Sequence, residues 1–204
     1  SLKNAHKSAA WGGMCSEVDL KILTALLTLL TLCSCAVINE DFYFPSANGG
    51  SVEKESCRGG VGADNTLVLN FKDVIAKFSI RIYGEKRFFS VIFTVPEGTE
   101  VIWPQQAIIA VAEDTSIDLT ISSFARVVSR GDDYQTTEYR AGTIMKNNSD
   151  NLEDEYFESI LLPTTDFKVL TIENLNIIIN GEKLSVPSMR FEKSSGYFLH
   201  PLNC

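Results

Sequence analysis

The carboxylates between Asp150 and Glu158 are the densest group of side chains in this 204-residue chain that could bind a metal ion or act as an acid or base. Carboxylate oxygens are ligands that Ca²⁺ prefers, and two acids facing each other across a cleft can hydrolyse a glycosidic bond. The EF-hand spacing D-x-[DN]-x-[DN]-G is absent, however, and the sequence places no two acids across a cleft. A solvated loop is therefore the favoured interpretation of the run, which consists of Asp150, Glu153, Asp154, Glu155 and Glu158.

Other catalytic patterns are weak in this sequence. Only His6 and His200 could supply imidazole, which leaves few ways to build a histidine metal site or a catalytic triad. The glycine-rich residues 57–62 lack the Gly-Lys-Ser/Thr of a phosphate-binding loop, so these glycines are better explained as turn residues. We therefore expect no catalytic residue, no metal site and no cofactor.

The N-terminal region carries the most specific pattern. Residues 22–32 are eleven positions without a charge, preceded by Lys21. This is shorter than the roughly 20 residues that span a bilayer and has the length of a signal-peptide core. The Leu32-Cys33-Ser34-Cys35 sequence that follows resembles the lipobox of bacterial lipoproteins. The alternative is a buried apolar helix followed by two incidental cysteines.

The lipobox resemblance implies that Cys35 is lipidated and becomes the new N-terminus. Ser34 provides the small preceding residue, whereas Cys33 fits less well because bulky Leu32 comes before it. In the sorting rule of bacterial lipoproteins, Ala36 at the next position implies transfer to the outer membrane. Which face of that membrane the protein would occupy, periplasmic or surface, stays open.

The start of the chain suits a signal peptide poorly. Translation from Met14 would place Glu17 and Asp19 in the signal peptide, whereas initiation at Leu20 gives a short basic start. We therefore expect residues 1–19 to be an untranslated or misassigned extension and residues 20–34 to be the signal peptide. Residues 35–41 would be a lipidated tether, and residues 42–204 a single domain.

Two cysteines remain after the anchor is set aside, Cys57 and Cys204. The cell envelope is oxidising, so an even pair predicts a disulfide. Such a bond would close a loop of nearly the whole domain, worth about 4–5 kcal/mol in the chain-entropy model. Two free thiols or zinc ligands are the alternatives, and the absence of a CxxC motif makes zinc the weaker of these.

The composition is that of a globular, acidic protein. Hydrophobic residues make up 45% of the chain, and 18 basic residues against 26 acidic ones give a net charge of -8. Nucleic acids need clustered Lys and Arg on the protein, so this balance argues against a nucleic-acid partner. No internal repeat or interdomain linker is evident.

The remainder of the chain predicts short β-strands. Apolar and β-branched runs recur between turn residues, and residues 74–83 and 87–95 read as one hairpin across Gly84. Asn180-Gly181 lies between two further alternating runs, which is the strongest short hairpin signal because a type I′ turn needs positive φ at both positions. The other expected strands cover residues 66–71, 108–112, 117–128, 134–145, 156–162, 167–172 and 188–191.

Roughly nine or ten such strands predict an all-β fold, an antiparallel β-sandwich that we expect to be immunoglobulin-like. The alternative is a β-rich domain with one helix at residues 151–160, where Leu152, Tyr156 and Phe157 have helical spacing.

The expected function is that of a non-enzymatic envelope lipoprotein, anchored through Cys35, that binds a protein or another envelope component. Two alternatives stay open. One is an envelope hydrolase that uses carboxylates such as those near residues 150–158, and the other is a carbohydrate-binding module with Trp103 or Tyr43 as its platform. A flat apolar patch would favour binding, whereas a deep pocket with convergent acids would favour hydrolysis.

Overall fold

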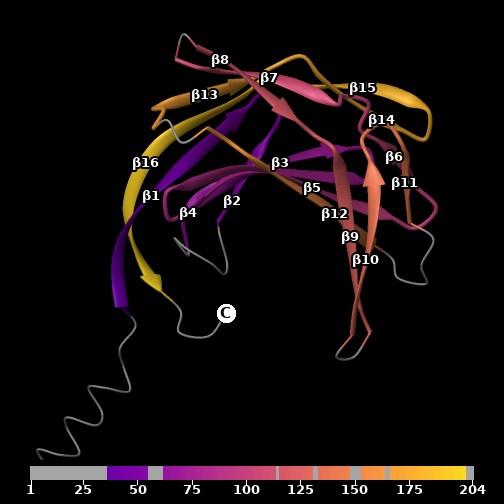
Figure 1. Cartoon of the computed structure of the whole chain (residues 1–204), viewed down its shortest axis with the longest axis horizontal. Coiled ribbons are helices and arrows are strands. Elements are labelled where there is room, and N and C mark those ends of the chain that lie inside the picture. The colour runs from indigo at the N-terminus through magenta and orange to yellow at the C-terminus, as the bar shows by residue number, and fades with distance from the viewer. Residues whose placement is uncertain are drawn as a thin grey trace, which may run out of the picture. The chain divides into compact units, whose positions relative to one another are not determined.

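The computed structural model describes residues 36–54, 62–113, 115–130, 133–147, 153–163 and 166–200. Within these ranges the chain forms strands and turns, and none of the described residues is helical. The strands pair in three antiparallel sheets (Figure 1). The described residues from Val37 onward belong to one compact unit.

The first sheet has five strands, and its outer strand β1 lies next to β16 although the two are at opposite ends of the sequence (Figure 1). Residues 36–41, which we expected to form a tether, lie in β1. The order across the sheet is β1 (Ala36–Ala47), β16 (Met189–His200), β13 (Val169–Ile172), β7 (Ala107–Ala112) and β8 (Thr115–Thr120).

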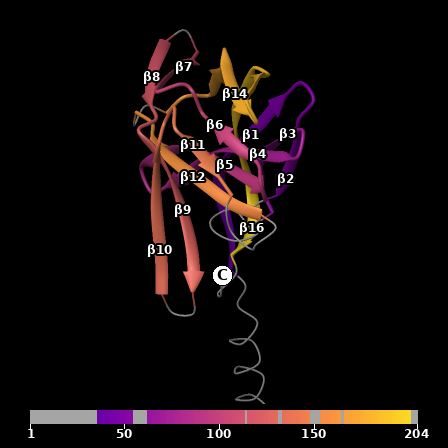
Figure 2. The same cartoon turned by 90° about the vertical axis from the view of Figure 1, so that its right-hand side faces the viewer.

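The second sheet has seven strands. Its β9–β10 hairpin extends past the neighbouring strands at one end of the sheet, as both views show (Figures 1 and 2). The order is β10 (Asp133–Arg140), β9 (Ser123–Arg130), β12 (Glu153–Leu161), β5 (Lys86–Pro96), β4 (Val74–Tyr83), β3 (Asp64–Phe71) and β2 (Ser51–Lys54).

The third sheet has four strands and contains the predicted Asn180-Gly181 hairpin. Asn180 has φ 48° and Gly181 has φ 81°, and the flanking residues Ile179 and Glu182 pair directly. Both positive φ angles are those a type I′ turn requires, so this prediction is confirmed. The order is β11 (Ile144–Lys146), β6 (Glu100–Ile102), β14 (Leu175–Ile179) and β15 (Glu182–Val186).

Apolar side chains from all three sheets meet in one core. On β5, Phe89 and Phe93 are fully buried, and consecutive residues of this central strand are buried on both of its faces. Phe89 contacts Phe191 of β16 edge to face, with ring centroids 6.0 Å apart, so the five-stranded and seven-stranded sheets pack against each other. The all-β antiparallel sandwich is thereby confirmed.

Several finer expectations also differ from the structure. Sixteen described strands in three sheets do not confirm the immunoglobulin-like form, which has seven to nine strands in two sheets. The expected strand 117–128 is divided at residues 121–122 into β8 and β9, which belong to different sheets. The expected strand 134–145 is likewise divided, at residues 141–143, into β10 of the seven-stranded sheet and β11 of the four-stranded sheet. The alternative helix at 151–160 is wrong, because nine residues of β12 pair with β5 and so give this segment a period of two.

Candidate functional site

The residues expected to carry the anchor and the disulfide lie outside the described residues. These are Cys35, Cys57 and Cys204, so the lipid and the disulfide stay predictions. The same holds for Asp150 and for the side chains of Glu153, Asp154 and His200.

The described part of the acidic run lies in strand β12 rather than in the expected loop. Glu155 is exposed, whereas Glu158 is half-buried. Burial raises the pKa of the Glu158 carboxyl, and the negative charge of Glu138 raises it further. Across the described residues, no three His, Cys, Asp or Glu side chains are grouped to hold a metal ion.

The proposed aromatic platform for carbohydrate is wrong in both of its residues. Trp103 is 1% exposed and Tyr43 is fully buried. The Trp103 ring packs against Phe93 and Phe124, with centroids 5.8 and 6.0 Å away, so its faces are used by the core. The sequence does not distinguish an exposed ring from a core ring at these two positions, because the packing of the sheets decides which face of each strand is buried.

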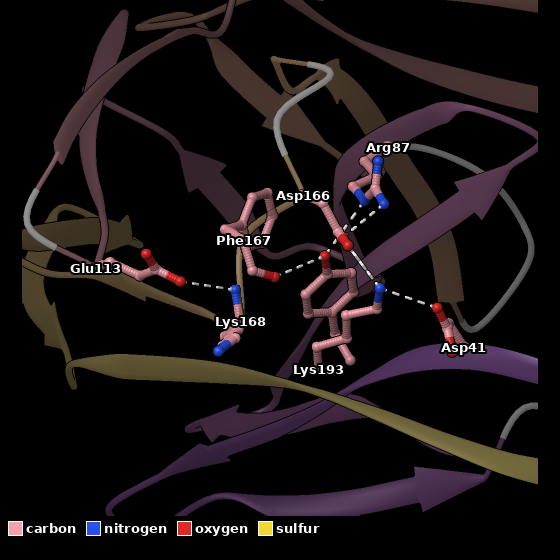
Figure 3. Close-up of polar contacts among 8 residues, drawn as sticks. Asp41, Arg87, Glu113, Asp166, Phe167, Lys168 and Lys193 are labelled. Carbon is pink, nitrogen blue, oxygen red and sulfur yellow. Dashed lines mark hydrogen bonds and ion pairs between the residues drawn. The ribbon is translucent and has the colours of Figure 1, made fainter.

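The most connected polar group in the described structure is a cluster of five residues, here called the charged cluster (Figure 3). It joins β1, β5, β16 and the segment that leads into β13. The Arg87 guanidinium contacts Asp166 at 2.8 Å, and the Lys193 ammonium lies 2.9 Å from both Asp166 and Asp41. Its members are Asp41, Tyr43, Arg87, Asp166 and Lys193.

Tyr43 provides the buried part of the charged cluster. Its hydroxyl donates to the Phe167 carbonyl at 3.1 Å and accepts from Arg87 Nε at 3.2 Å. The Tyr43 and Phe167 rings also touch, with centroids 4.9 Å apart. Burial raises the pKa of the Tyr43 hydroxyl, so this group stays protonated and available as a donor at neutral pH.

The acidic and basic side chains of the cluster form ion pairs with one another. A hydrogen bond from Lys193 is the main reason that the pKa of Asp166 is lowered, and Arg87 contributes. Hydrogen bonds to Asp166 and Asp41 raise the pKa of the Lys193 ammonium. The cluster therefore links β1 and β16 of the five-stranded sheet to β5 of the seven-stranded sheet and to the segment before β13, which is a structural role. No sequence motif could have revealed it, since Tyr43 and Phe167 are 124 positions apart.

A second feature lies beside β7 in the five-stranded sheet. A hollow of about 280 Å³ opens between β7 and the connection from β13 to β14. Ile109 is 60% exposed and Val111 37% exposed at this position, so two large apolar side chains lie side by side at the surface beside the hollow. We call it the β7 hollow; its lining consists of Gln105, Ala107, Ile108, Ile109, Val111, Glu173, Asn174 and Leu175.

Comparison with known proteins adds no family. No protein-family model, no curated protein and no solved structure matches the chain. Within the part of the chain that the structure describes, no helix has both the length and the apolar character needed to cross a bilayer.

Proposed function

We propose that this protein is an envelope lipoprotein, anchored to the outer membrane through Cys35, whose β-sandwich binds a partner rather than catalysing a reaction. The anchor is supported by the lipobox residues 32–35 and by Ala36 after them. Strand β1 begins at Ala36, so a lipid on Cys35 would be joined directly to the sandwich and would hold it close to the membrane surface.

The β7 hollow is the observation that carries the binding role. Exposed large apolar side chains next to a concavity are typical of interaction sites. Ile109 and Val111 project from the same face of β7, because they alternate with buried Ile108 and Ala110. The charged cluster, by contrast, engages its charges internally, which supports a structural role for those residues.

Metabolic labelling with a fatty-acid analogue tests the anchor. Expressed in a diderm bacterium from a start codon at position 20, the protein should incorporate the label and fractionate with the outer membrane, and Cys35→Ala should abolish the incorporation. Cys33→Ala is the matched control and should retain it. Equal labelling of wild type and Cys35→Ala would overturn the anchor, and loss only in Cys33→Ala would move it to Cys33.

Site-specific photo-crosslinking in intact cells tests the binding role. A photoreactive amino acid at position 109 should yield discrete adducts of higher mass. Leu161 of β12 is the matched control position, since it is an apolar residue of similar exposure, 57% against 60% for Ile109. Adducts absent from position 109, or equal at 109 and 161, would contradict a binding site at the β7 hollow.

A further inference from the structure

Strand β7 pairs with a neighbouring strand over its full length on one side but over only half its length on the other. On one side it pairs with β8 along its full length, from Ala107 to Ala112. On the other side it pairs with β13 only from Ala110 to Ala112. Residues 107–109 therefore have a sheet edge that β13 does not cover, and the β7 hollow lies along that edge.

The hydrogen-bond alternation shows which main-chain groups this edge presents. Ile121 N–H donates to the Gln106 carbonyl at 2.8 Å, and Glu113 N–H donates to the Val169 carbonyl at 3.3 Å. Even-numbered residues of β7 thus bond toward β8, and odd-numbered residues point toward β13. The N–H and C=O groups of Ala107 and Ile109 consequently face the hollow, and the described chain gives them no strand partner.

The backbone after β13 explains why the edge is open. Asn174 has φ 59°, a left-handed conformation that takes the chain out of the sheet, and Leu175 begins β14 in another sheet. The neighbouring edge is closed by a side chain. With its amide oriented to satisfy both groups, Gln105 donates to the Asn176 carbonyl at 2.9 Å and accepts from Asn176 N–H at 2.7 Å. The open stretch therefore suits a segment of about three residues.

We propose that the β7 hollow binds an extended basic segment of a partner protein by strand addition, with Ala107 and Ile109 supplying the main-chain hydrogen bonds. This deepens the proposed binding function and rests on it. Strand addition takes affinity from main-chain bonds and specificity from alternate side chains. Inward side chains of the added strand would meet Ile108 and Leu175, which are apolar.

The charges around the hollow indicate which side chains the added strand should carry on its outer face. Glu173 lines the hollow, and exposed Asp118 lies directly opposite Ile109 on β8. The lining contains no Lys or Arg. A lysine on the outer face of the added strand could lay its methylene chain over Ile109 and direct its ammonium toward Glu173 or Asp118.

A capped, fluorescein-labelled pentapeptide, Lys-Val-Lys-Val-Lys, is the probe, titrated into the full chain and followed by anisotropy and amide hydrogen exchange. Binding should slow exchange of the Ala107 and Ile109 amides at least tenfold. Ile109→Lys should weaken binding at least tenfold by adding a positive charge at the edge. The matched control Leu161→Lys should stay within twofold, and Glu173→Gln should weaken binding several-fold.

Peptide variants separate strand addition from other modes of binding. In antiparallel addition the residues that exchange hydrogen bonds with Ala107 and Ile109 are the ones with outward side chains, which are the lysines of the probe. Methylating the main-chain nitrogens of the lysines removes these donors, so binding should be lost. Retained binding of the methylated peptide, or no binding of the parent peptide at millimolar concentration to the folded chain, would overturn the proposal. Protection of Ala107 and Ile109 through self-association without peptide would also overturn it, in favour of a second copy. If the peptide does not bind but crosslinks still form at position 109 and not at position 161, strand addition is wrong and the proposed binding function is retained.

Discussion

The hydroxyl of Tyr43 donates a 3.1 Å hydrogen bond to the main-chain carbonyl of Phe167 and so connects strand β1 to the segment that precedes β13. Because Arg87 Nε donates to the same hydroxyl, one phenol oxygen satisfies a carbonyl on one side and a guanidinium on the other. The charged groups Asp166, Lys193 and Asp41 surround this bond nearer the surface. Fixing β1 also matters for the proposed anchor, since Cys35 directly precedes this strand.

Removing the Tyr43 hydroxyl should destabilise the fold. Tyr43→Phe keeps the buried ring but leaves the Phe167 carbonyl and Arg87 Nε without this partner, which should lower the free energy of unfolding by about 1–2 kcal/mol. Urea denaturation measures the change. Tyr83→Phe is the matched control, since Tyr83 is 48% exposed, and its effect should stay within about 0.5 kcal/mol. Equal effects of the two changes would contradict the role assigned to the hydroxyl.

The charged cluster should give the protein an acid-sensitive component of stability. The pKa of Asp166 is lowered by Lys193 and Arg87, so the folded state favours the ionised carboxylate. The stabilisation is present above the ordinary aspartate value near 3.8 and is lost as pH falls through the lower folded value. Urea midpoints of wild type should therefore fall over this range, and Asp166→Asn should flatten the fall.

Salt provides the control for the Asp166 prediction. Asp166 is exposed, so molar salt should screen its ion pairs and reduce the difference between wild type and Asp166→Asn at neutral pH. Identical pH profiles of the two proteins at low salt would contradict the assignment.

At the Asn180-Gly181 turn, the contribution of the backbone conformation to stability can be measured separately from that of the Asn180 side chain. Asn180 Oδ1 accepts a 2.9 Å hydrogen bond from Glu100 N–H, which links the hairpin to β6. Asn180→Gly keeps the positive φ and loses only this bond, whereas Asn180→Ala loses both. Thermal or urea unfolding should rank wild type above Asn180→Gly, and Asn180→Ala lower still by about 1 kcal/mol. The reverse order of the two variants would show that φ at this position does not limit stability.

Local features of the fold could be predicted from the sequence, because their causes are local. The Asn180-Gly181 turn follows from backbone sterics, and the β4–β5 hairpin follows from alternation around Gly84. The extent of β16 was underestimated. Its polar residues 192–196 carry little apolar signal, yet they continue a strand next to β1.

The charged cluster and the β7 hollow could not be predicted, because both depend on distant segments. Asp41, Arg87 and Lys193 come from three strands that the fold alone brings together. The open edge of β7 depends on where β13 ends, and Asn174 gives no sequence signal that distinguishes it from other turn asparagines. Trp103 and Tyr43 show the same limit, since their exposure is set by sheet packing.

The disulfide between Cys57 and Cys204 stays a prediction with a direct thermal test. Strand β16 ends at His200, four positions before Cys204, so a bond there would fasten the end of a long strand. Reducing agent should lower the melting temperature, and Cys57→Ser and Cys204→Ser should each reproduce that decrease without adding to it. No change on reduction, together with two titratable thiols in the unreduced mature protein that begins at lipidated Cys35, would refute the pairing.

Glu158 should make the protein less stable as pH rises, the opposite of Asp166. Its pKa is raised chiefly by burial, so the folded state binds the proton more strongly than the unfolded state does. Stability should then fall as pH rises from the ordinary glutamate value near 4.5 through the higher folded value, because charging a half-buried carboxylate is unfavourable. Glu158→Gln should remove this fall and raise the melting temperature at pH 7 more than at pH 4. The exposed neighbour Glu155 supplies the control, and a Glu155→Gln profile that matched Glu158→Gln would disprove the role of burial.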